Sequence, residues 1–139
     1  MVNSFTEMQD NVLAALKGCA SDAGVHPDSV SFSTHSPVPP AIQLAVYPVE
    51  GPAPVKNPVW FDAVVDVYCY AAGSVNNQES VNNAMEIAYH VFRAVNGLPW
   101  ILRAKSPSVV AFIDENGRIT HPDRCAVVVS FDARYHVGV

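Results

Sequence analysis

Residues 59–71, VWFDAVVDVYCYA, have the pattern of one long β-strand with two different faces. Apolar side chains occupy every second position from Val59 to Cys69, and the positions between them carry mainly carboxylates and aromatic rings. Because successive side chains of a strand point to opposite faces of its sheet, one face is predicted to be buried and the other semi-polar. At about 3.3 Å per residue the strand would reach about 40 Å, which is longer than a typical strand. Strands of this length are typical of sheets that bend or pair beyond their own domain.

Two helices are predicted, one on each side of this strand in the sequence. In residues 79–96 the apolar positions follow a helical repeat: Val81, Ala84, Met85, Ala88, Val91, Phe92 and Val95. Asn96-Gly97 and Pro99 favour an end to this helix. Residues 4–23 have a similar one-sided pattern, which begins with a capping box formed by Ser4 and Glu7 and ends before Gly24.

The remaining segments predict further strands joined by proline-rich or polar connections. Residues 41–47 and 124–137 alternate like strands, and residues 108–113 would pair with 124–137 around a tip at 114–123. Residues 100–104 are either a short strand or an irregular lead into 108–113. The prolines within 25–40 favour an extended connection, and the four prolines within 48–58 predict a stiff, exposed loop.

The order of elements is therefore α-β-β-α-β-β. It predicts a single α+β domain over residues 1–139, a two-layer sandwich with a mainly antiparallel sheet of four to five strands. Both amphipathic helices would cover one face of this sheet. The other face would remain semi-polar and carry Trp60, Tyr68 and Tyr70.

The overall composition limits the classes of function. Half of the 139 residues are hydrophobic but only 15% are charged, which is below the usual quarter. Either a partner covers part of the surface, or the surface is polar through Ser and Asn. The net charge of −5 and scattered basic residues, of which only Arg103 and Lys105 lie close together, argue against tight nucleic-acid binding.

The lack of a recognisable targeting signal, together with the cysteine usage, favours a cytoplasmic protein. We find no secretory signal at the start of the sequence and no apolar run of about 18 residues, the length that a membrane span needs. The three cysteines lie far apart in the sequence, and we expect reduced, mostly buried thiols. Cys69 and Cys125 fall on predicted core faces of strands, and Cys19 on the buried stripe of the first helix.

The sequence offers little for catalysis, and we predict no enzyme activity, no cofactor and no metal. Phosphate-binding glycine motifs and paired-cysteine metal motifs are absent from the sequence. His121 and Cys125 could join His26 or His35 in a zinc site, but a simple turn at residues 121–123 is favoured. Asp62 and Asp66 would lie roughly 13 Å apart on one strand, too far for a catalytic pair.

Surface residues carry the clearest functional signal. Tyr and Trp are enriched in the cores of protein–protein interfaces. We therefore predict a subunit interface on the outer face of the long strand together with the proline loop, formed by Trp60, Asp62, Asp66, Tyr68, Tyr70, Pro52 and Pro54. The alternative is that the neighbouring strand or the proline loop packs against these aromatic rings within the domain.

Three segments together resemble a known family: the strand 59–70, the helix SVNNAMEIAYHVFRAV at 80–95, and the closing strand 125–137. In order and length they are similar to the tail terminator (tail completion or minor tail) proteins of tailed bacteriophages. The resemblance extends over nearly the whole chain and rests on pattern, with no signature motif. The loops at 48–58 and 114–123 are individual to this sequence.

The resemblance implies a structural virion protein without catalytic residues. Such proteins form a ring, usually a hexamer, that caps the tail tube and meets the head-completion or neck proteins, while DNA passes through the lumen without specific binding. The expected location is the virion tail or neck, and the host cytoplasm during assembly. The alternatives are another head-tail connector or neck subunit, or a small α+β ligand-binding or enzymatic domain with a pocket lined by His90 or Cys69.

Overall fold

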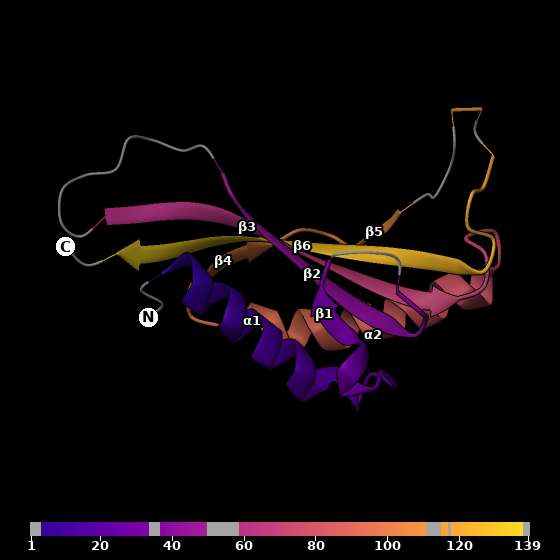
Figure 1. The fold of residues 1–139 in the computed structure, drawn as a ribbon, viewed down its shortest axis with the longest axis horizontal. Coiled ribbons are helices and arrows are strands. Elements are labelled where there is room, and N and C mark those ends of the chain that lie inside the picture. Colours follow the sequence, from indigo (N-terminus) through magenta and orange to yellow (C-terminus); the bar gives the residue numbers. More distant parts are fainter. Residues whose placement is uncertain (1–3, 34–36, 50–58, 111–114, 117, 138–139) are drawn as a thin grey trace.

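The computed structural model describes residues 4–33, 37–49, 59–110, 115–116 and 118–137 as two layers. Both helices lie on the same side of the sheet (Figure 1). The elements in chain order are α1 (Phe5–Ala20), the 3-10 turn η1 (Pro27–Ser29), β1 (Val30–Phe32), β2 (Ala41–Pro48), β3 (Val59–Ala72), α2 (Gln78–Asn96), β4 (Ile101–Ala104), β5 (Ser108–Val110) and β6 (Arg124–Val137). The predicted α+β class and the two-layer arrangement are confirmed.

The sheet is centred on the two longest strands, β3 and β6, which have 14 residues each. They pair antiparallel from Val59↔Val137 to Ala72↔Arg124 without a shift of register. The strand order is β1-β2-β3-β6-β4, and β5 pairs with another part of β6. Every pairing is antiparallel except that between β1 and β2, which is parallel.

Strand β1 lies in a segment that the sequence predicted to be an extended connection. Val30 is buried, and the partly buried Phe32 packs against the core. The turn before the strand is stabilised by His26, whose Nδ1 accepts a hydrogen bond from the Asp28 amide. Because β1 adds a strand, the sheet has six strands within the described residues, where four to five were predicted.

Both helices begin at capping residues. As predicted, the Ser4 Oγ accepts a hydrogen bond from the Glu7 amide at 3.0 Å, and α1 follows. The Asn77 side chain caps α2 in the same way by accepting from the Glu79 amide. Helix α1 ends at Ala20, three residues earlier than predicted, and the chain then turns through Gly24, which has a φ of 77°.

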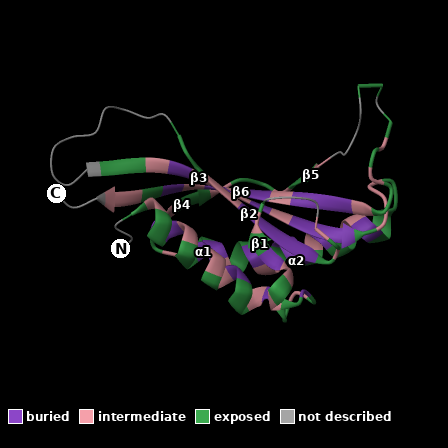
Figure 2. Cartoon of the chain, viewed as in Figure 1, coloured by how far each residue is buried: buried purple, intermediate pink, exposed green. Residues whose placement is uncertain are grey.

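The core lies between the helices and one face of the sheet, as the buried residues in Figure 2 show. Its members from α1 are Met8, Val12, Leu16 and Ala20, and those from α2 include Ala84, Ile87, Ala88, Val91 and Val95. Phe131 of β6 is the largest fully buried side chain. Cys69 and Cys125 are buried here as predicted, whereas Cys19 is only half-buried.

Candidate functional site

The open face of the sheet, the face away from α1 and α2, carries the five predicted interface residues that belong to β3. From β3 it presents Trp60, Asp62, Val64, Asp66, Tyr68 and Tyr70, and their register partners on β6 are His136, Arg134, Asp132, Ser130, Val128 and Ala126. None of the described helices covers these residues (Figure 1). The alternation of residues 59–71 therefore predicted the two faces correctly.

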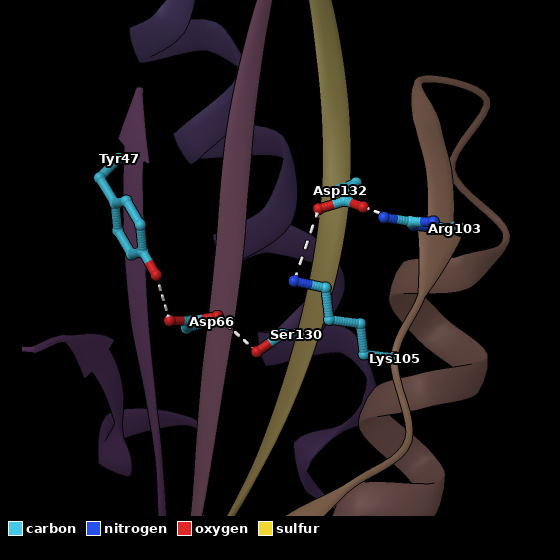
Figure 3. Close-up of polar contacts among 6 residues, drawn as sticks. All are labelled: Tyr47, Asp66, Arg103, Lys105, Ser130 and Asp132. Carbon is cyan, nitrogen blue, oxygen red and sulfur yellow. Dashed lines mark hydrogen bonds and ion pairs between the residues drawn. The ribbon is translucent and has the colours of Figure 1, made fainter. Parts of the chain in front are cut away.

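Asp66 connects three strands through its carboxylate (Figure 3). It accepts a hydrogen bond of 2.6 Å from the Tyr47 hydroxyl on β2 and another of 2.6 Å from the Ser130 hydroxyl on β6. The hydrogen bond to Asp66 raises the pKa of Tyr47 to about 12, because the phenol must give up this bond to ionise. Asp66 therefore ties β2, β3 and β6 together on the open face.

The two other carboxylates of this face are also paired within the chain. Asp62 accepts a hydrogen bond of 2.9 Å from the Nε of Arg134. Asp132 accepts one of 2.6 Å from the Nε of Arg103, and the Nζ of Lys105 lies 3.9 Å from it (Figure 3). Cross-strand pairing thus accounts for the acidic residues that the sequence places on the outer face.

The three aromatic side chains that β3 presents on the open face differ in how accessible they are. Trp60 is 38% exposed, and its ring lies against His136 with centroids 5.1 Å apart. Tyr70 is only 9% exposed, because it packs in a small cluster with Ala41 and Ala126, and Tyr68 is partly buried against the same cluster. Tyr70 therefore offers little surface to a partner and Trp60 offers more, and the subunit interface itself stays a prediction.

Two further predicted interface residues, Pro52 and Pro54, lie outside the described residues. His35 also lies outside them, as do Asp114 and Gly117 of the predicted tip at 114–123 and residues 111–113 of the predicted strand 108–113.

An apolar groove opens beside Trp60. It has a volume of about 460 Å³ and is lined by Trp60, Pro99, Trp100, Leu102 and Arg134. Leu102 is 56% exposed and also lines a neighbouring hollow of about 430 Å³ that reaches Val49 and Asp62. The pairing of β4 with β6 shifts register between Ile101 and Arg103, and Leu102 lies at this irregularity. The sequence carries no signal for Leu102, because a bulge in a four-residue strand leaves no pattern of alternation.

Burial raises the pKa of the Cys69 and Cys125 thiols, which disfavours the reactive thiolate. Neither the apolar groove beside Trp60 nor the neighbouring hollow is lined by His90 or Cys69. Over the described part of the chain, no group of three or more His, Cys, Asp or Glu side chains is placed to hold a metal ion.

No helix within the described residues is both long enough and apolar enough to cross a bilayer. Searches against protein-family models and against curated proteins returned no match for this sequence.

Proposed function

We propose that this protein is a structural subunit of a tailed-bacteriophage particle, of the tail terminator type. In this role it assembles with copies of itself into a ring, with six subunits as the expected number. The ring caps the tail tube and offers a surface to the head-completion or neck proteins, and DNA passes through its lumen without specific binding. The protein would act in the virion tail or neck and assemble in the host cytoplasm.

The observation that carries this proposal is the apolar groove on the open face. Trp60 and Leu102 expose large apolar side chains there, while the carboxylates around them are already paired within the chain. Exposed aromatic side chains beside a concave apolar surface are typical of binding hot spots. Because the carboxylates of this face are held in cross-strand pairs, a partner that covers them would not leave one buried without a counterpart.

Trp60 and Phe61 provide a matched test of this proposal. They are neighbours on β3 with nearly equal exposure, 38% and 39%, but they lie on opposite faces of the sheet. Trp60 borders the groove, whereas Phe61 stacks on Tyr135 with centroids 5.5 Å apart. We expect Trp60→Ala to abolish ring formation measured by native mass spectrometry, and Phe61→Ala to retain it. Equal assembly of both variants would contradict the role of the open face.

Localisation within a particle separates the terminator role from that of another connector or neck subunit. Electron microscopy of the assembled particle should place the subunit at the head-proximal end of the tail tube. Density elsewhere along the neck would favour the other connector role.

The groove also supports a second candidate, a small ligand-binding domain. Its volume of about 460 Å³ falls in the usual range for ligand pockets, roughly 300–1,000 Å³. Arg134 offers a cation at its wall, so the ligand would combine an apolar body with an anionic group. A stable monomer whose melting temperature rises with such a compound would favour this candidate over the ring.

A further inference from the structure

Exposed apolar side chains gather along two opposite margins of the sheet. The strand order places β1 and β2 at one margin and β4 and β5 at the other. At the first margin Val38 lies next to β1 and β2, and Tyr47 and Val49 lie at the end of β2. At the second margin Leu102 and Val109 are exposed on β4 and β5. The two margins are therefore both apolar, but they are built from different elements.

The same two sides of the molecule carry opposite charge. Helix α1 packs on β1 and β2 as well as on α2, and Phe5 in its first turn reaches Tyr135 of β6, so only the charges after this turn are assigned to the first side. In the described residues 9–33 and 37–49 the carboxylates are Asp10, Asp22 and Asp28, against the one cation Lys17. Residues 91–110, from the end of α2 through β4 and β5, contain Arg93, Arg103 and Lys105 and no carboxylate. Arg103 and Lys105 both remain largely exposed although Asp132 of β6 lies beside them.

We infer that neighbouring copies of this chain bind head to tail, with the acidic α1–β1–β2 side of one copy against the basic β4–β5 side of the next. This inference rests on the proposed ring and specifies its contact. A ring needs a heterologous interface, in which one patch meets a different patch on the neighbour. A symmetric contact between two identical sides would place like charges opposite each other, which is unfavourable.

The head-to-tail contact is continuous with the groove on the open face. Leu102 belongs both to the β4–β5 margin and to the wall of the groove that contains Trp60. Val49 of the other margin borders the neighbouring hollow, which Leu102 also lines. A neighbouring copy bound at the β4–β5 margin of one copy would therefore cover Leu102 of that copy and extend towards its Trp60.

A mixing experiment distinguishes this contact from a symmetric one. One double variant, Leu102→Asp with Val109→Asp, disrupts the β4–β5 margin, and a second, Ser31→Lys with Val38→Lys, disrupts the β1–β2 margin by placing cations opposite Arg103 and Lys105. All four positions are exposed, so both variants should fold, which circular dichroism would verify. The control is made in two versions, Asn76→Asp with Asn82→Asp and Asn76→Lys with Asn82→Lys, at exposed positions before and near the start of α2 that lie outside both sides.

Each variant alone should be monomeric, the control should form the ring, and an equal mixture of the two variants should give a one-to-one heterodimer and nothing larger. Carbodiimide coupling of carboxylates to lysine before native mass spectrometry would capture this heterodimer. Added salt should reduce its yield, since the contact joins opposite charges. The inferred contact is wrong if the wild type forms rings and either variant still does so, or if the mixture gives no heterodimer. Neither result would contradict the proposed ring. A wild-type chain that stays monomeric would overturn both.

Discussion

The two faces of the sheet are built from the same strands but have different physical roles. On the helix side of β3 and β6, Val65, Val67, Val129 and Phe131 are fully buried under α1 and α2. On the open side, the alternate positions hold Asp62, Asp66 and Asp132 in cross-strand pairs, beside the exposed Trp60. The helix side supplies stability, and in the proposed ring the open side makes the contacts with partners.

Substitution of the central core residue should produce the largest effect on stability. Phe131→Ala removes a fully buried ring and leaves a cavity, and we expect the free energy of unfolding to fall by about 3–5 kcal/mol. Urea denaturation followed by circular dichroism would measure the change. Leu102→Ala, on the open side, should change it by only about 0.5 kcal/mol or less. Similar losses in the two variants would contradict the division of roles between the faces.

Removal of the Asp66 carboxylate should have an intermediate effect. Asp66→Ala leaves the hydroxyls of Tyr47 and Ser130 without their acceptor, and we expect a loss of about 1–2 kcal/mol in the same denaturation experiment. Asp66→Asn retains one acceptor oxygen and should lose less. An Asp66→Ala variant as stable as the wild type would show that these bonds do not hold the open face together.

The smallest effect should appear only at high pH, through Tyr47. Its pKa is raised from 10.0 to about 12 in the folded chain, so the folded state favours the protonated phenol. The stability that this provides should be fully present below pH 10 and should be lost as the pH rises to about 12. Absorbance of tyrosinate would follow the titration, and Asp66→Asn should lower the pKa of Tyr47. A wild-type titration in which no tyrosine ionises as late as about pH 12 would contradict the hydrogen bond.

Three of the long periodic elements, β3, α2 and β6, could be predicted from the sequence within one residue, whereas α1 ends three residues earlier than predicted. Strand β6 has the predicted bounds, while β3 and α2 each extend one residue beyond theirs, because many apolar side chains repeat the same period in each. Strand β1 was missed because three residues are too few to establish alternation, and nearby prolines favour a connection.

The details of the candidate site depend on the register between strands, which the sequence does not contain. Tyr70 was assigned to the correct face, but its register partners on both sides, Ala41 and Ala126, are small. These small neighbours leave space for the aromatic ring of Tyr70 to pack against them, so Tyr70 is buried instead of exposed. The apolar groove likewise depends on the irregular pairing of β4, which brings Leu102 beside Trp60 and Trp100.

Hydroxyl-radical footprinting of the wild-type chain, as separated monomer and as assembled ring, tests whether the open face of the sheet makes the contacts of the ring. It compares the oxidation of Trp60 on the open side with that of Phe61 on the helix side, two residues of nearly equal exposure in the free subunit. We predict that assembly protects Trp60 strongly and leaves Phe61 reactive. Trp60 oxidised equally in the two forms would show that the open face does not make the contact.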